Sequence, residues 1–321
     1  MPPSRARPRP GRKTDARAGA GPTPRVRRDL DGVVVVDKPA GWTSHDVVAR
    51  ARGILAEKRC GHAGTLDPDA TGVLVIGVGR ATRLLRFATA LPKTYVGEVV
   101  LGTSTSTLDA SGTVTGTFEM ASVTLEGVRA AAAALTGRIL QTPPMVSAVK
   151  VAGRRLHELA RAGVEVERKP RPVEVFRFDV EATDDPAVFA VEVACSSGTY
   201  VRVLAADLGA ALGGGAHLRA LRRTAVGGFV VDRAVTLDAL SVGDVRPMGE
   251  LVAHLPAVAA DAGVAAAIVH GRVLPRPLVG ATGDGPWAVF DGSGQLLAVY
   301  EAYAADRMKP TVVVCTEAPS G

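Results

Sequence analysis

The chain has few cysteines and no long apolar run. Its 321 residues include only three cysteines, at positions 60, 195 and 315, and no two of them form a CxxC pair. This spacing argues against both a disulfide framework and a zinc site, and it fits a reducing compartment. The longest apolar runs, such as residues 33–36 and 130–135, are far shorter than the roughly 20 residues that a membrane-spanning helix needs. We therefore expect a soluble protein with no membrane partner.

The first 30 residues are rich in arginine, proline and glycine, and they lack the apolar centre of a secretory signal. We therefore expect a cytoplasmic protein. These residues hold nine Lys or Arg and two Asp, a net charge of +7, whereas the whole chain carries +6, so the remainder is close to neutral. Their composition predicts a disordered tail, which either contacts phosphates non-specifically or only adds solubility. A nucleic-acid site in the folded part must depend on local clusters of charge.

The hydrophobic pattern predicts an α+β fold. A strand that begins near Gly32 leads to a helix through DVVARARGIL, which Thr43 or Ser44 can cap and which has Asp46 in its first turn. No sustained alternation of helix and parallel strand follows, so we expect a mixed, largely antiparallel sheet flanked by helices. Further predicted elements are the strands VLVIGVG, 93–102, 173–181 and 188–195, and helices at 124–135 and within VRVLAADLGAAL.

The composition changes near residue 249. Beyond it, WAVFDGSGQLLAVYEA predicts two strands around a tight Asp-Gly-Ser-Gly turn, and TVVVC predicts another strand. We therefore expect a basic tail at 1–30, a main domain at 31–248 and a small β-rich domain at 249–321.

The stretch GHAGTLDPDATGVL, residues 61–74, places Asp67 among three glycines and before a proline. Gly61, Gly64 and Gly72 allow unusual backbone angles, and the apolar run that follows predicts a buried strand, so the stretch is expected to form a rigid loop anchored on the core. Asp67 and Asp69 alone are explained more simply as turn formers than as metal ligands.

Other motifs carry less chemistry. VIGVGRAT has two of the three glycines of a dinucleotide-binding turn, HELAR lacks the second histidine of a zinc protease, and no serine stands in a G-x-S-x-G turn. The residues 216–227, AHLRALRRTAVG, predict a helix that places Arg219 and Arg222 or Arg223 on one basic face beside Leu221. Such a face suits RNA phosphates and equally suits a solvated amphipathic helix.

Six ordered blocks together resemble the TruB family of tRNA pseudouridine-55 synthases, and the resemblance covers about residues 32–230. The family implies an enzyme that isomerises uridine 55 in the T-loop of tRNA, breaking the N-glycosidic bond and rejoining the base through carbon. The blocks are VVVDKPAGWTSHDVV, GHAGTLDPDATGVLVIGVGRATR, KTYVGEVVLGTSTSTLDASG, QTPPMVSAVKVAGRRLHELARAG, SGTYVRVLAADLG and HLRALRRTAVGGF.

The resemblance also implies the catalytic residues. The Asp of the LDP element, here Asp67, corresponds to the catalytic carboxylate. The Tyr of K-x-Y, here Tyr95, corresponds to the residue that stacks on the target base and is the candidate proton acceptor. The Tyr and Arg of G-T-Y-x-R are Tyr200 and Arg202, and the arginine is expected to pair with the catalytic carboxylate. Such a pair keeps an acid ionised where water is excluded.

The remaining expectations concern substrate and partners. The resemblance places Lys38 and His62 in the site, beside Tyr200, and Leu221, Arg219 and Arg222 are further candidate substrate-binding residues. It implies a tRNA partner recognised through the T-arm stem-loop, a small PUA-like RNA-binding domain after the catalytic domain, and no cofactor or metal, because the isomerisation is redox-neutral. We expect a stand-alone monomer of the bacterial type that does not bind DNA.

Two other functions compete with this interpretation. One is an RNA chaperone that refolds tRNA and whose catalysis is secondary or lost. The other is a hydrolase of glycosidic bonds, which needs a second carboxylate as acid. Asp69 and Asp109 are the candidates near Asp67 in the sequence.

Overall fold

The computed structural model describes residues 30–315, except 148–149, 152–153, 156–163 and 165. The tail at 1–29, for which the composition predicts disorder, lies outside the described residues. Within the described part, no helix is long and apolar enough to cross a membrane.

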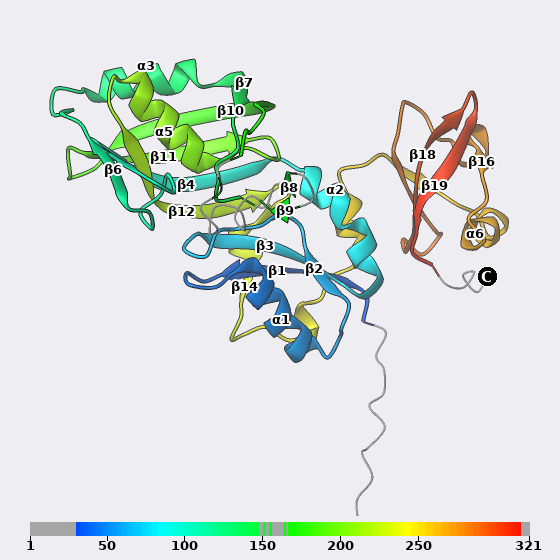
Figure 1. Cartoon of the computed structure of the whole chain (residues 1–321). Coiled ribbons are helices and arrows are strands. Elements are labelled where there is room, and N and C mark those ends of the chain that lie inside the picture. Colours follow the sequence, from blue (N-terminus) through cyan, green and yellow to red (C-terminus); the bar gives the residue numbers. More distant parts are fainter. Residues whose placement is uncertain (1–29, 148–149, 152–153, 156–163, 165, 316–321) are drawn as a thin grey trace, which may run out of the picture.

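The largest β-sheet of the described residues holds ten strands, in the order β14-β1-β3-β12-β4-β11-β10-β7, with β2 beside β3 and β13 beside β12 (Figure 1). The pairs β1/β14 and β3/β12 are parallel, and the other described pairs are antiparallel. The predicted mixed, largely antiparallel sheet is thus confirmed. Its strands are β1 (Gly32–Lys38), β2 (Cys60–His62), β3 (Thr71–Val78), β4 (Lys93–Leu101), β7 (Gly137–Gln141), β10 (Arg171–Ala182), β11 (Val188–Cys195), β12 (Ala216–Val226), β13 (Phe229–Val230) and β14 (Val235–Thr236).

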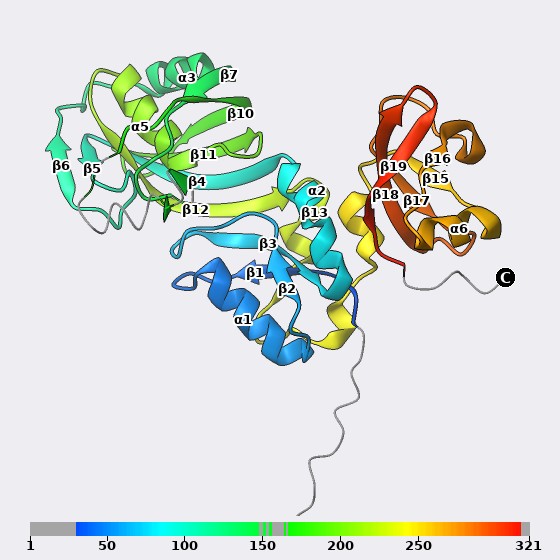
Figure 2. The same ribbon diagram turned by 45° about the vertical axis from the view of Figure 1, so that its right-hand side comes forward.

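Helices cover the sheet in two groups (Figures 1 and 2). Helix α1 (Ser44–Leu55) packs beside β1 and β2, whereas α3 (Leu125–Ala134) and α5 (Val201–Ala211) lie over β10, β11 and β12. The predicted cap of α1 is confirmed, because Thr43 and Asp46 form a reciprocal capping box. Shorter elements are α2 (Leu85–Ala90), the 3₁₀ helices η1 (Gly79–Leu84), η2 (Val231–Arg233) and η3 (Val242–Asp244), and the hairpins β5 (Thr103–Thr105) with β6 (Val114–Thr117) and β8 (Lys150–Val151) with β9 (Arg154–Arg155).

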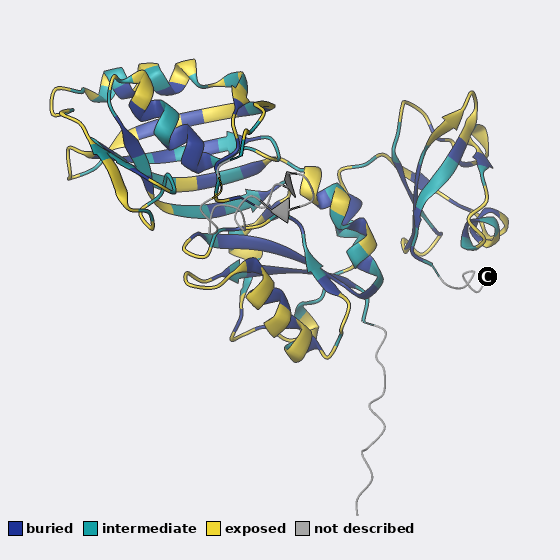
Figure 3. Ribbon diagram, in the orientation of Figure 1, coloured by how far each residue is buried: buried dark blue, intermediate teal, exposed yellow. Residues whose placement is uncertain are grey.

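Strand β1 is buried on both faces, which explains its continuous valine run. Val34 and Val36 pack against α1, whereas Val33 and Val35 belong to a second cluster with η1 and α2. Each fully buried valine contributes about 1.5 kcal/mol to folding. Packing on both faces holds β1 and its neighbours rigidly beneath the loops that follow them. Helix α1 exposes only the face that points away from the sheet (Figure 3).

The predicted helix at 216–227 is wrong. These residues form strand β12, which pairs antiparallel with β4 over most of its length and parallel with β3 at Arg222 and Arg223. Leu, Ala and Arg favour a helix locally, but pairing on both edges in the middle of a sheet overrides that preference. Two register shifts, at Leu218/Ala220 and Arg223/Ala225, break the alternation that identifies a strand in sequence.

The C-terminal residues form a second, five-stranded sheet with the order β15-β17-β18-β19-β16. The predicted hairpin is confirmed, since β17 and β18 pair antiparallel. Apolar residues of this sheet, including Val299 and Val312, join one cluster with Val226 and Phe229 of the large sheet. The expected division at 248/249 stays a prediction. The elements are η4 (Met248–Val252), β15 (Ala257–Ala259), α6 (Ala262–Val269), β16 (Leu274–Pro275), η5 (Arg276–Val279), β17 (Trp287–Phe290), β18 (Leu296–Ala304) and β19 (Arg307–Val313).

Candidate active site

The loop between β2 and β3 carries Asp67 and follows the sequence expectation of a tight turn anchored on a strand. Gly64 and Gly72 both have φ +100°, a conformation that other residues rarely adopt. At Gly72 a side chain is also excluded by space, because a Cβ would lie 2.2 Å from the Arg223 carbonyl oxygen. Gly61 lies within strand β2. The loop therefore closes against β12 at a fixed place.

Lys38 supports this loop from inside the protein. The side chain is fully buried at the end of β1, and its Nζ donates to the carbonyl oxygens of Pro39 at 2.9 Å, Trp42 at 2.6 Å and Pro68 at 2.8 Å. Burial lowers the pKa of Lys38 to about 8, although two neighbouring carboxylates oppose the shift. Lys38 therefore ties the residue after Asp67 to the turn before α1, and it does not line the hollows described below.

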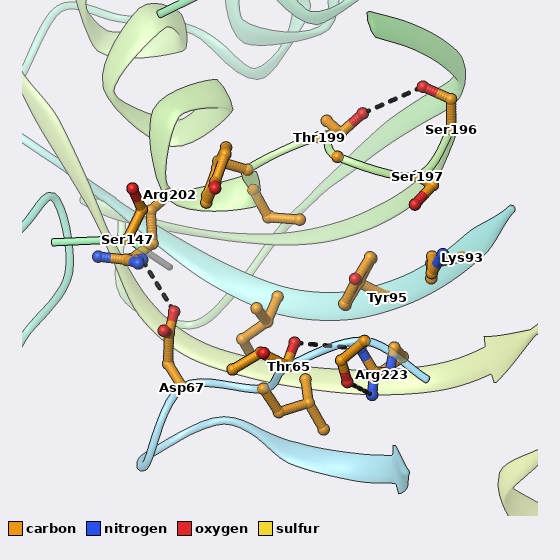
Figure 4. Close-up of a pocket in the computed structure, with 16 residues that line it drawn as sticks. Thr65, Asp67, Lys93, Tyr95, Ser147, Ser196, Ser197, Thr199, Arg202 and Arg223 are labelled. Atoms are coloured by element: carbon orange, nitrogen blue, oxygen red, sulfur yellow. Dashed lines mark hydrogen bonds and ion pairs between the residues drawn. The ribbon is translucent and has the colours of Figure 1, made fainter. Parts of the chain in front are cut away.

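Asp67 and Arg202 form an ion pair, with 3.0 Å between Asp67 Oδ2 and Arg202 Nε (Figure 4). The guanidinium also donates to the carbonyl oxygens of Thr107 at 3.0 Å and Val146 at 2.9 Å, and it lies 3.4 Å from Asp109 Oδ2. Four contacts fix its position, as only a forked guanidinium allows. The structure thus brings together the two residues that the resemblance pairs.

The Asp67 carboxylate is open on one side. Its side chain is 44% exposed, whereas that of Arg202 is 5% exposed. Burial has the largest effect on Asp67 and raises the pKa of its carboxylate. The Arg202 cation opposes this rise most strongly and Lys38 less so, whereas the neighbouring carboxylates of Asp109 and Asp69 add to it. Among the described residues, no backbone amide of its own loop donates to the carboxylate, so the turn-former interpretation of Asp67 does not hold.

Two hollows meet at this pair. One has a volume of about 240 Å³ and the other about 330 Å³, and both are lined by Asp67, Arg202 and Leu221. The first is drawn in Figure 4. Its other lining residues include Thr65, Lys93, Tyr95, Ser147, Ser196, Thr199, Tyr200 and Arg223; the second adds Asp69, Thr107, Asp109, Val146 and Arg219.

Tyr95 and Tyr200 both line the first hollow, as the resemblance implies. Tyr95 is on β4 and only 9% exposed, and burial raises the pKa of its hydroxyl, an effect that the neighbouring Arg223 cation opposes. Tyr200 stands at the start of α5 and is held by Gln141: the Tyr200 amide donates to Gln141 Oε1 at 2.7 Å, and Gln141 Nε2 donates to the Tyr200 carbonyl at 3.2 Å. The backbone at Tyr95 is held by the sheet, and the backbone at Tyr200 is held by Gln141.

His62 is the last residue of strand β2, and it is not among the residues that line either hollow. Its ring meets the His45 ring edge to face, with 5.3 Å between centroids. Burial, then the charges of His45 and Arg223, lowers the pKa of His62 to about 4, so the imidazole is neutral at physiological pH. A direct contact of His62 with substrate stays a prediction.

Arg219 and Arg222 do not share a basic face, because strand geometry turns them to opposite sides. Arg219 lies in the wall of the second hollow and pairs with Glu98 at 2.8 Å. Arg222 donates to both carboxylate oxygens of Asp37, at 3.0 and 2.7 Å. Both cations have acidic partners, and the expected joint face is absent because the segment is a strand; RNA binding by either arginine stays a prediction.

No role was predicted from the sequence for Lys93, which lines the first hollow, or for Gln141 next to Tyr200, and Arg223 was predicted only as an alternative to Arg222 on the basic face. Each is at most 5% exposed, and each bonds backbone groups distant in the chain or across a turn. All three stand inside the blocks that carry the family resemblance, but nothing in their local sequence indicates which backbone groups they bond. Within the described residues, no group of three or more His, Cys, Asp or Glu is arranged to hold a metal ion.

Comparisons with known proteins point to one family over most of the chain. Residues 52–201 match the model for the N-terminal domain of TruB family pseudouridylate synthase, and residues 202–245 match the C-terminal domain of tRNA pseudouridylate synthase B. The tRNA pseudouridine synthase B of Thermobifida fusca is 50% identical over 293 residues, which are 88% of this chain and 98% of the relative. That of Streptomyces coelicolor is 48% identical over 283 residues, 85% of this chain and 94% of the relative. Among solved structures, a chain of a Cbf5-Nop10-Gar1 complex is 28% identical with a TM-score of 0.70, covering 89% of this chain and 85% of that chain.

Proposed function

The chain belongs to the TruB family of pseudouridylate synthases, and from this premise we propose that it isomerises uridine 55 in the T-loop of tRNA to pseudouridine, with Asp67 as its catalytic carboxylate. The relatives named above are tRNA pseudouridine synthases, which supports an isomerase that acts on tRNA. The uridine position and the role of Asp67 are the finer parts of the proposal.

One observation carries this proposal: an open carboxylate is held beside a buried guanidinium where two hollows meet. A nucleotide in a folded loop must leave its stack before its glycosidic bond becomes accessible. In the first hollow, the aromatic rings of Tyr95 and Tyr200 can replace part of the stacking that the flipped base loses. Hydroxyl groups such as that of Thr199 can bond the polar edge of a uracil. The site therefore suits a flipped pyrimidine.

The chemistry requires one bond exchange at the sugar. The bond between N1 of the base and C1′ breaks, the bond between C5 and C1′ forms, a proton leaves C5, and N1 gains a proton. Ionised Asp67 acts in this exchange as nucleophile or base, and Arg202 opposes the rise in its pKa that burial causes. Tyr95 is placed in the same hollow as the proton acceptor.

The proposal extends to the partner. The protein acts as a monomer on the T-arm stem-loop of tRNA, in the cytoplasm, without DNA or a membrane. The five-stranded C-terminal sheet is the PUA-like unit that adds RNA contacts, and the basic residues of the tail add a salt-dependent attraction to phosphates.

The test is to incubate the full chain with an unmodified tRNA transcript and to map carbon-linked uridine along it. We expect pseudouridine at position 55, and none there in a transcript with cytidine at that position. Release of free uracil would identify a hydrolase instead. Refolding of the tRNA without any isomerised product would identify a chaperone, and modification only at other uridines would contradict the assigned position.

A further inference from the structure

Arg223 is a buried cation without a carboxylate partner among the described residues. It is 1% exposed, yet no carboxylate of the described chain lies within 4.0 Å of its guanidinium, whereas its neighbour Arg222 pairs with Asp37 and Arg202 pairs with Asp67. Burial of a charge is costly unless other groups compensate for it. Arg223 is therefore a candidate for a role in the active site, either through its charge or through its hydrogen bonds.

The hydrogen bonds of Arg223 hold both arms of the Asp67 loop. Its Nη1 donates to the Thr65 carbonyl at 3.3 Å (Figure 4) and its Nη2 to the Gly64 carbonyl at 3.1 Å, both before Asp67. Its Nε donates to the Val73 carbonyl at 2.7 Å, beyond Asp67. A planar guanidinium that bonds both arms resists their separation. These bonds fix the position of the Asp67 loop relative to strand β12.

The same guanidinium faces Tyr95. Arg223 and Tyr95 are direct cross-strand partners on β12 and β4, and both line the first hollow. Three of the five N–H groups of the guanidinium serve the loop carbonyls, which leaves two donors on its Nη atoms. The positive charge stabilises negative charge on the phenol oxygen. It opposes the rise in the Tyr95 pKa that burial causes and to which Cys195 and Asp67 add.

We propose that Arg223 is a positioning residue for the proposed isomerisation, which fixes the Asp67 loop against β12 and lends its positive charge to the Tyr95 oxygen. This inference rests on the proposed function. Because burial raises the pKa of Tyr95, the phenolate is the minor form at neutral pH, and the Arg223 charge increases its share. This phenolate takes the proton that leaves C5 of the uracil and becomes the neutral phenol. The phenol then gives a proton to N1 of the product, which restores the phenolate, so no other reactant is consumed.

Two variants separate charge from hydrogen bonding. Arg223→Gln removes the cation and keeps an amide donor, whereas Arg223→Lys keeps the charge and loses the fork. Arg129→Gln is the matched control, because Arg129 also donates to a backbone carbonyl, that of Val180 at 2.9 Å, away from the site. Single-turnover conversion of a T-arm stem-loop and RNA affinity are measured for each across a range of pH.

In Arg223→Gln we expect the single-turnover rate at neutral pH to fall by roughly 10², with RNA affinity within about threefold of wild type and partial recovery of the rate at higher pH. Arg223→Lys is expected to retain more of the neutral-pH rate, and Arg129→Gln all of it. Equal losses in both Arg223 variants at every pH, or a loss of affinity that accounts for the loss of rate, would overturn the proposal.

A second measurement does not require activity. Tyrosinate absorbance titrations of wild type and Tyr95→Phe give the pKa of Tyr95 by difference, and the same comparison is made in the Arg223→Gln background. We expect the Tyr95 pKa to be higher without the cation. An unchanged value would refute the coupling even in a folded, active protein, whereas a wild type without isomerase activity would refute the proposed function instead. If Arg223→Gln does not fold, Arg223→Met, which also removes the cation, is titrated in its place, with the same rise in the Tyr95 pKa expected and an unchanged value again refuting the coupling.

Discussion

Arg202 Nε lies 3.0 Å from Asp67 Oδ2, and the two members of this pair differ in exposure: the guanidinium is buried and the carboxylate is 44% exposed. A structural ion pair in a protein core is closed on both sides. Here one oxygen-bearing side chain faces two hollows, and the cation behind it is fixed by two carbonyls and a second carboxylate. The pair is therefore arranged to present an acid to a ligand.

Replacement of Arg202 tests this arrangement. In Arg202→Met the cation that opposes the raised pKa of Asp67 is lost, so the acid limb of the pH–rate profile moves to higher pH. We expect kcat/KM to fall by roughly 10²–10⁴. In Arg202→Lys the limb stays closer to wild type, although the rate still falls because the fork is lost. An acid limb at the same pH in wild type and Arg202→Met would show that this limb does not report Asp67.

Gln141 is expected to act through Tyr200. It is 2% exposed, and both of its hydrogen bonds go to the Tyr200 backbone, so Gln141→Ala frees the first turn of α5. We predict a loss of about 1–3 kcal/mol in unfolding free energy and a fall of roughly tenfold in kcat/KM. Urea unfolding and steady-state kinetics measure the two effects. Gln295→Ala, in an exposed turn, is the control, and an equal loss there would contradict the assignment.

Arg219 and Arg222 are predicted to differ in RNA binding. Arg219 is half-exposed in the wall of the second hollow, whereas Arg222 is bound through two contacts to Asp37. In plots of log affinity against log salt, Arg219→Ala should reduce the slope by up to about one unit, and Arg222→Ala should leave it unchanged. Identical slopes in wild type and both variants would remove Arg219 from the RNA contacts.

His62 predicts a pH dependence of stability. Because its pKa is lowered to about 4 in the folded protein, the unfolded chain binds the proton first as the pH falls below about 6.5. The stabilisation is fully present above that pH and is lost progressively as the pH falls toward 4. Urea unfolding between about pH 7 and about pH 4.5 should show wild type losing on the order of 1–2 kcal/mol more than His62→Gln. Parallel pH curves would contradict this prediction.

Local chemistry made much of the fold predictable. The capping box of Thr43 and Asp46 marks the start of α1, and the apolar run of β3 marks a buried strand. Strand β12 was predicted wrongly because its residues prefer helix and its two register shifts hide the period of a strand. Only its pairing with β3 and β4, which lie far away in the chain, determines its structure.

The site was predictable to a different degree. Asp67, Tyr95, Tyr200 and Arg202 came from resemblance, and the structure places them together, although their catalytic roles stay predictions. Gln141 opens one of the blocks of the resemblance, but its role could not be found this way, because its partner Tyr200 is 59 residues away in the sequence. Supporting residues of this kind become visible only when the fold brings the segments together.

The most direct test of the account is the single-turnover isomerisation of a T-arm stem-loop by wild type and by Asp67→Asn, with RNA affinity measured in parallel. Asparagine keeps the size of the side chain and removes its charge, so the account predicts that the variant binds RNA within a few-fold of wild type and forms no detectable pseudouridine. A variant that still forms pseudouridine at a rate near that of wild type would contradict it.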